Sequence, residues 1–264
     1  MGHSDSPPVF QLHRGSAPLL VSLPHDGTAV PAEIAARLAP ASRQVPDTDW
    51  HVARLYAFAR EWGASMIVPA YSRYVVDLNR PPDDASLYPG QNTTGLCPQV
   101  RFDGQPVYLP GQAPGPDEVA QRVERYWRPY HRALAAELER LHALHGRVLL
   151  WEGHSIRSVV PFLFEGRLPD LNLGTAGGAS VRAATRARLQ AALAAQDAYG
   201  HVLDGRFRGG YITRHYAAPA RGIEAVQLEL AQCNYMDEGS FAYRPDLAAR
   251  LQPVIAALLR AALG

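Results

Sequence analysis

The sequence predicts an α/β protein, a single domain built on a mixed β-sheet that is flanked by helices on both faces. Short apolar runs rich in β-branched residues alternate along the chain with longer segments of helical periodicity, and this alternation is typical of the class. The chain has 264 residues, 47% of them hydrophobic, and no Ser/Gly-rich linker or charge run divides it. That length and composition suffice for one substantial core. We therefore expect residues 1–264 to form one domain.

Six segments are predicted to be strands because they are short, apolar and bounded by turn-forming residues. The first runs into a Pro-His-Asp-Gly turn, and the fourth ends in Trp-Glu-Gly-His. The six are Pro18–Leu23, Ala64–Val68, Tyr74–Leu78, Arg147–Trp151, His201–Leu203 and Glu224–Leu230.

Four segments carry apolar residues at positions i, i+3, i+4 and i+7, which indicates helices with one buried face. They are Asp49–Trp62, Asp117–His145, Val181–Ala195 and Pro245–Leu263.

The stretch from Pro81 to Pro116 breaks this pattern. It is rich in proline and contains the polar run Gln91-Asn92-Thr93-Thr94-Gly95. A loop this long inside a compact domain is usually either functional or disordered. Because it begins directly after Arg80, we interpret it as a wall of an active site.

Charge and hydropathy exclude several classes of partner. The net charge is +1 and acidic and basic residues are interspersed, so no nucleic-acid or anionic-membrane surface is expected. No apolar stretch reaches the roughly 18 residues that span a bilayer, and Met1–Pro8 lacks the features of a signal peptide. Cys97 and Cys233 have no metal-binding spacing and are interpreted as structural thiols. We expect a cytoplasmic protein whose partner is a small molecule.

Two histidines follow apolar strands in matched contexts. His25 lies at the carboxyl end of Pro18–Leu23, and His154 follows the run Val148-Leu-Leu-Trp-Glu-Gly. The carboxyl edge of an open α/β sheet is where ligands bind, and neutral imidazole is a common zinc ligand. Either histidine alone would more often be structural, but the matched pair favours a zinc site.

A catalytic zinc ion needs a third protein ligand, and a carboxylate is expected. Asp47 and Asp49 both lie at the start of a predicted helix, and His51 on the same segment is a weaker candidate. Asp47 is well placed to cap the first turn of that helix. Asp49 would then be free to turn toward the metal.

Asn79 and Arg80 are predicted to leave the strand Tyr74–Leu78 at its end. A guanidinium matches a carboxylate with two parallel hydrogen bonds, and an asparagine can orient the same group. The alternative is a structural ion pair between Arg80 and Asp77. Arg73 is a candidate for stabilising a developing oxyanion.

Glu229 lies in the apolar interior of the predicted strand Glu224–Leu230. A lone buried carboxylate is costly unless it is paired or used. A glutamate beside a metal-bound water is the usual general base, and a structural ion pair is the alternative.

The segment Gly209–Tyr216 combines glycines with polar side chains. It is interpreted either as a loop that closes over substrate, with Thr213 or Arg214 as contacts, or as a plain hairpin.

Motifs along nearly the whole chain resemble the N-formylglutamate amidohydrolase family. The resemblance implies the fold of the related zinc carboxypeptidases and aspartoacylases, with one zinc ion per chain. The motifs are Pro24-His25-Asp26-Gly27, Asp47-Thr48-Asp49-Trp50-His51, Ser72–Arg80, His154-Ser155, Leu173-Gly174-Thr175, Gly209–Arg214 and Gln227-Leu228-Glu229.

The resemblance also implies a ligand set and a base. His25 and His154 would bind zinc and Glu229 would be the general base. The first carboxypeptidase motif has its acidic ligand three residues after the histidine, where this chain has Thr28. Asp49 is therefore inferred as the replacement ligand.

The implied reaction is hydrolysis of N-formyl-L-glutamate to formate and L-glutamate, the last step of a histidine degradation route. Asn79 and Arg80 would hold one substrate carboxylate, Arg157 or Arg214 the other, and Arg73 would assist at the oxyanion. Two alternatives remain: an amidohydrolase or carboxypeptidase for another N-acyl amino acid or short peptide, and a catalytically inactive protein that binds an acidic metabolite.

Overall fold

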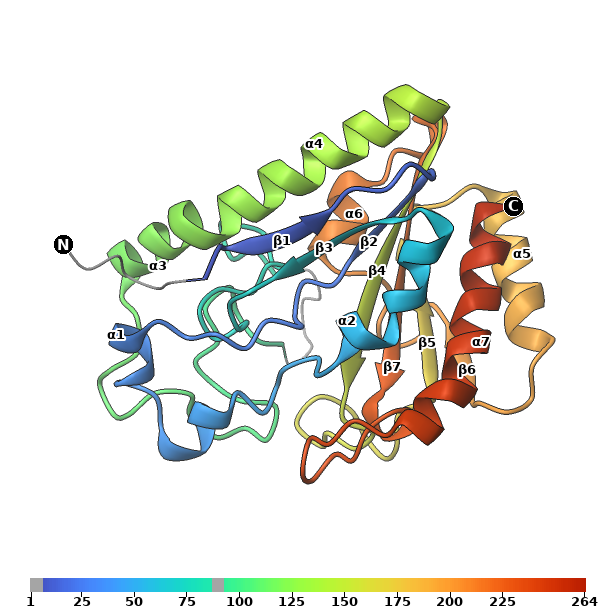
Figure 1. Cartoon of the computed structure of the whole chain (residues 1–264). Helices are drawn as coiled ribbons and strands as arrows, with labels where there is room; N and C mark the ends of the chain where they lie inside the picture. Colours follow the sequence, from blue (N-terminus) through green and yellow to red (C-terminus); the bar gives the residue numbers. More distant parts are fainter. Residues whose placement is uncertain (1–6, 87–92) are drawn as a thin grey trace.

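A seven-stranded mixed β-sheet lies between two layers of helices in the computed structural model, which describes residues 7–86 and 93–264 (Figure 1). The strand order is β1-β3-β2-β4-β7-β5-β6. The central strands β3, β2, β4 and β7 are parallel, while β1 at one edge and the β5–β6 pair at the other run antiparallel to them. The predicted fold class is confirmed. The strands are β1 (Phe10–His13), β2 (Leu19–Ser22), β3 (Ser65–Pro69), β4 (Val148–Ile156), β5 (Leu171–Gly174), β6 (His201–Leu203) and β7 (Ile223–Ala231).

The helices divide between the two faces of the sheet. On one face, α4 (Arg128–His145) lies against β2, β3 and β4, and α6 (Tyr211–Tyr216) packs against β4 and β7. On the other face, α5 (Ala183–Ala194) and α7 (Pro245–Leu263) pack together, and α2 (Val52–Leu55) contacts β4 (Figure 1). The other helical segments of the described residues are α1 (Ala32–Ala35), α3 (Pro116–Arg122), a π-helical stretch (Val123–Trp127) that joins α3 to α4, and five 3-10 segments (Pro40–Gln44, Ala57–Trp62, Ala176–Gly178, Pro219–Arg221 and Gln232–Asn234).

Residues of the two central strands alternate between the two faces. Trp151 and Val226 point into the core under α5 and α7, whereas Leu150 and Ala225 point into the core under α4. Toward the carboxyl ends of both strands, the residues on the sheet face covered by α4 change from apolar to polar at the same level. The polar residues there are Glu152 and His154 on β4 and Gln227 and Glu229 on β7, all buried and paired in register. This places a polar cluster at the carboxyl ends of the central strands.

The predicted strand Tyr74–Leu78 is wrong. The segment turns instead: the amide of Val75 bonds to the carbonyl of Ser72, and the amide of Asp77 bonds to the carbonyl of Leu96. The Arg122 guanidinium donates to the carbonyls of Tyr74 and Val75. These backbone groups are thus satisfied without a sheet partner, so a buried apolar run need not join the sheet.

The predicted helix Asp49–Trp62 is shorter and broken. His51 has left-handed backbone angles (φ 63°), so α2 begins only at Val52. The expected cap is also wrong, because the Asp26 carboxylate rather than Asp47 accepts the amide of Ala53 in the first turn. Asp49 is thereby left outside the helix.

The predicted helix Val181–Ala195 is confirmed with a small shift, and Pro245–Leu263 has the predicted bounds. The predicted helix Asp117–His145 is helical throughout, but the π-helical stretch Val123–Trp127 divides it into α3 and α4. Strands β1 and β5 were not predicted. The segment after Gly209-Gly210 is a short helix, α6, and not a hairpin. In the parts of the chain that the structure describes, no helix has the length and apolar character needed to cross a bilayer.

Candidate metal centre and active site

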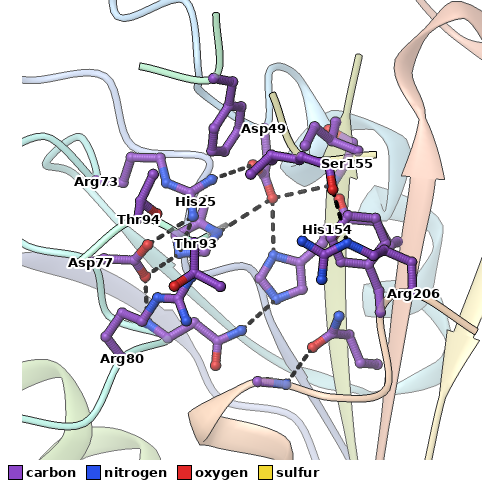
Figure 2. A pocket seen from close by; sticks show the side chains of 18 residues that line it. His25, Asp49, Arg73, Asp77, Arg80, Thr93, Thr94, His154, Ser155 and Arg206 are labelled. Carbon is purple, nitrogen blue, oxygen red and sulfur yellow. Dashed lines mark hydrogen bonds and ion pairs between the residues drawn. The ribbon is translucent and has the colours of Figure 1, made fainter. Parts of the chain in front are cut away.

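Three potential metal ligands converge at the carboxyl edge of the sheet. His25 follows β2, His154 lies in β4, and Asp49 precedes α2, yet their ligand atoms lie within 4.8 Å of one another. Both imidazoles turn Nδ1 toward the same oxygen, Asp49 Oδ2, at 3.0 Å for His154 and 3.6 Å for His25 (Figure 2). The three residues predicted as ligands are thus brought together.

Backbone contacts explain why Asp49 occupies this position. Its amide donates to the carbonyl of His25 at 3.0 Å, and its Oδ2 accepts the amide of Ser155 at 3.1 Å. Asp47 points elsewhere, since its Oδ2 accepts the hydroxyl of Tyr74 and the amide of Phe102. His51 also points away, toward the carbonyl of Phe241.

A carboxylate holds the far nitrogen of each histidine. His25 Nε2 lies 2.7 Å from Asp77 Oδ1, and His154 Nε2 lies 2.6 Å from Glu152 Oε1. Such partners fix the orientation and tautomer of a ligating imidazole and increase its basicity. Thr213 in turn donates its amide and its hydroxyl to Glu152. Thr213 is fully buried, so it supports Glu152 rather than lining the pocket.

Unbalanced charge and an unpaired oxygen indicate that the donor set suits a cation. Asp49 Oδ1 is buried and has no hydrogen-bond partner among the described residues; Arg73 Nη1 is 3.7 Å away. Four buried carboxylates gather here, Asp49, Asp77, Glu152 and Glu229, with Arg73 as a buried cation beside them. Two imidazole nitrogens and a carboxylate oxygen form a set that zinc prefers.

The pKa shifts of Asp49 and His154 also indicate that this site favours positive charge. Burial favours the neutral acid of Asp49, but His25 and His154 outweigh it and hold the pKa of Asp49 below its usual range. Burial alone would lower the pKa of His154, yet Glu152 and Asp49 raise that pKa well above its usual value. A metal ion held by these residues would supply positive charge at the same place.

Glu229 lies beside the donor set on the neighbouring strand. Its Cα is the register partner of His154 across the β4–β7 pair, and its side chain lines the pocket. Burial raises the pKa of the Glu229 carboxyl to about 8, while the charge of His154 acts in the opposite direction. No side chain in the described part of the chain donates a hydrogen bond to this carboxylate. Glu229 therefore gains and loses its proton near neutral pH rather than near pH 4.5, in the range where acid–base catalysis is most effective.

Arg73, Asn79 and Arg80 all line the pocket. Arg73 donates to Asp77 Oδ2 at 2.7 Å, so Asp77 pairs with Arg73 and His25. Asn79 Nδ2 lies 3.1 Å from His154 Nε2. The Arg80 guanidinium makes no hydrogen bond or ion pair within residues 7–86 and 93–264. Burial alone would raise the pKa of Asp77, but His25 and Arg73, with a smaller contribution from the Arg80 charge, hold it well below its usual range.

The structure does not bring Arg157 and Arg214 to the pocket. Arg157 lies over the ring of Phe241, 5.5 Å from its centroid, in a separate cavity. Arg214 is exposed on α6, where its Nε donates to the carbonyl of Gly209.

Several pocket residues were not predicted from the sequence. Gln227 could have been found, because strand alternation puts it on the same face as Glu229 two residues later. The others come from loops and carry no local signal. They are Thr93, Thr94, Phe102, Leu163, Arg206 and Phe207.

Comparisons of the sequence with known proteins find matches over most of the chain. Residues 17–236 match the sequence model of the family described as N-formylglutamate amidohydrolase. An N-formylglutamate deformylase of Pseudomonas aeruginosa is 55% identical over 256 residues, covering 97% of this chain and 96% of the relative. One of Pseudomonas putida is 51% identical over the same share of each chain.

Solved structures show the same fold. The crystal structure of an N-formylglutamate amidohydrolase from Ralstonia eutropha superposes with a TM-score of 0.80 at 25% identity, covering 96% of this chain and 97% of the other. A gene product of Agrobacterium tumefaciens superposes with a TM-score of 0.70 at 16% identity, covering 97% and 96%, and supports the fold alone. By sequence and by structure, the chain belongs to the N-formylglutamate amidohydrolase family.

Proposed function

We propose that this protein is a zinc-dependent deformylase that hydrolyses N-formyl-L-glutamate to formate and L-glutamate, as the last step of a histidine degradation route in the cytoplasm. The observation that carries the proposal is the position of the Glu229 carboxylate beside the His25–Asp49–His154 donor set, in a pocket that also contains Arg80. The names of the Pseudomonas relatives support the choice of substrate.

His25, Asp49 and His154 would hold the zinc ion, each histidine through Nδ1. When bound, zinc supplies Lewis-acid chemistry, which activates water and polarises the formyl carbonyl. Asp77 and Glu152 keep the two imidazoles oriented for this task.

Glu229 is the proposed general base. It takes a proton from the attacking water as the oxygen adds to the formyl carbon, and it then delivers that proton to the departing amine. Burial raises the pKa of Glu229 to about 8, and a cation nearby would lower this pKa toward the working range.

Two groups are proposed to bind charge on the substrate. Arg73, which the Asp77 carboxylate holds in place at 2.7 Å, supports the oxyanion that develops on the formyl oxygen. Asn79 and Arg80 hold a substrate carboxylate, because the Arg80 fork faces the pocket without a described partner.

A hydrolysis panel tests the proposal. Purified protein is assayed with the N-formyl, N-acetyl and N-formimino derivatives of L-glutamate, before and after a chelator removes metal, and again after zinc is restored. We expect the formyl compound to be preferred, activity to disappear with chelator and zinc to restore it. If zinc-loaded protein does not release formate from N-formyl-L-glutamate, the proposed activity is wrong; if chelator has no effect, the metal requirement is wrong.

A further inference from the structure

Two arginines reach the pocket from different parts of the chain. Arg80 belongs to the turn that follows Asp77, and Arg206 belongs to the loop after β6. In Figure 2 they lie on opposite sides of the His25–His154 pair. Arg73, the third arginine of the pocket, is engaged by Asp77 at 2.7 Å. A substrate with two carboxylates needs two cationic partners, because an uncompensated carboxylate in a buried site is costly.

Apolar side chains border Arg206 in the pocket. Its Nε donates to the carbonyl of Leu163 at 3.1 Å, and its guanidinium lies 5.6 Å from the centroid of the Phe207 ring. Leu163 and Phe207 pack against Ile156 in one apolar cluster, and all three line the pocket. On this side of the pocket an arginine is therefore combined with hydrocarbon surface.

The surroundings of Arg80 are polar and close to the donor set. Its neighbour Asn79 reaches within 3.1 Å of His154 Nε2, and Asp77 bonds to His25. The α-carboxylate of an N-formyl amino acid is attached to the carbon that carries the scissile amide. It therefore lies near the reacting group, which is the side of Arg80.

The γ-carboxylate of glutamate lies two methylene groups further away. Those methylenes gain free energy from apolar contact, and the terminal carboxylate needs a cation beyond them. Leu163 and Phe207 with Arg206 offer both. We propose that Arg206 binds the γ-carboxylate of the substrate and thereby selects acidic side chains, while Arg80 binds the α-carboxylate. This assignment rests on the proposed deformylase activity.

The test compares two substrates that differ only in that group, N-formyl-L-glutamate and N2-formyl-L-glutamine. We expect the wild type to prefer the glutamate compound in kcat/KM. Arg206→Gln should lower kcat/KM for the glutamate compound about 10- to 100-fold, the usual value of a charge-assisted hydrogen bond, and change that for the glutamine compound much less. The ratio of the kcat/KM values for the two substrates should therefore fall toward one. Arg208→Gln is the matched control, because Arg208 is exposed on the same loop and does not line the pocket.

A second variant separates the two arginines. Arg80→Gln should lower kcat/KM for both substrates alike, since both carry the α-carboxylate, and should keep the preference between them. The inference is overturned if Arg206→Gln keeps the wild-type preference for the glutamate compound. It is also overturned if Arg206→Gln lowers kcat/KM equally for both substrates while Arg80→Gln abolishes that preference.

The result also separates this inference from the proposed function. If the wild type cleaves neither compound, the deformylase proposal itself fails. If the wild type cleaves N-formyl-L-glutamate and Arg206→Gln retains its selectivity, only the role of Arg206 fails.

Discussion

His154 and Glu229 stand side by side on neighbouring parallel strands, their Cα atoms in register across β4 and β7. One residue is a donor in the candidate metal site, and the other carries a carboxyl whose pKa burial raises to about 8. A rigid pair of central strands thus sets the spacing between the metal ligand and the proposed base, as precise catalytic geometry requires.

Replacing Glu229 with glutamine should remove the proposed base while keeping the shape of the side chain. We expect kcat to fall about 10²- to 10⁴-fold with little change in zinc content, because proton transfer is lost and the donor set is intact. Steady-state kinetics and metal analysis check this. Glu224→Gln is a control on the same strand, since Glu224 pairs with Arg182 outside the pocket. Near-normal turnover of zinc-loaded Glu229→Gln would refute the general-base role.

The acidic metal ligand can be identified by metal content. Asp49→Ala should fail to retain zinc after dialysis, because it removes the oxygen on which both Nδ1 atoms converge. Asp47→Asn should retain zinc, since Asp47 bonds to Tyr74 and Phe102 instead. Elemental analysis of both proteins decides between them. Full occupancy in Asp49→Ala with loss in Asp47→Asn would move the ligand to Asp47.

Thr213 is expected to act on the metal site through Glu152. Thr213→Val removes the hydroxyl that bonds to Glu152, so the support of His154 weakens. We expect zinc affinity to fall about 10- to 100-fold, the usual effect of losing an outer partner of a ligating histidine. Thr213→Ser, which keeps the hydroxyl, should restore most of the affinity in a chelator competition. If valine and serine variants bind zinc equally well, the hydroxyl has no such role.

His131 should make the fold sensitive to acid. Burial lowers the pKa of His131 from 6.5 to about 3, while its Nε2 bonds to the carbonyl of Leu78 and its Nδ1 to the hydroxyl of Tyr216. Below pH 6.5 the unfolded chain binds a proton that the folded chain excludes. Stability from this residue is therefore complete above pH 6.5 and is lost as the pH falls toward 3.

The size of this effect is measurable by denaturant unfolding. Between pH 7 and pH 5 the histidine should cost the wild type about 2 kcal/mol of unfolding free energy. The glutamine in His131→Gln cannot titrate. The unfolding free energy of this variant should therefore fall by about 2 kcal/mol less than that of the wild type over the same pH interval. If the unfolding free energies of the two proteins depend equally on pH, then His131 has the same pKa in the folded and unfolded chain.

Much of the site was predictable because it is encoded locally. His25, His154 and Glu229 each lie at or near the end of an apolar run, and parallel strands bring such ends to one edge of the sheet. The alternation of side chains along β4 and β7 then puts His154 and Glu229 on one face. These relations depend only on the two-residue period of a strand and on strand direction.

Other features depend on contacts between distant segments. Asp49 reaches the donor set, and Asp47 does not, because His51 adopts a left-handed conformation and the carbonyl of His25 accepts the Asp49 amide. Tyr74–Leu78 looks like a strand but turns, because Arg122, some 47 residues away in the chain from Val75, satisfies its carbonyls.

The arginines of the pocket show the same division. Arg80 adjoins Asp77 and Asn79 in a recognisable motif. By contrast, no local sequence pattern shows which of Arg157, Arg206 and Arg214 lines the pocket. The path of the loop after β6 brings Arg206 into the pocket, whereas Arg157, just after β4, and Arg214, on α6, lie outside it. Strand ends follow from short-range periodicity, but the position of a loop side chain follows from the packing of whole layers. The ligand residues near strand ends could thus be read from the order of amino acids, and the substrate-binding loops could be located only in the folded chain.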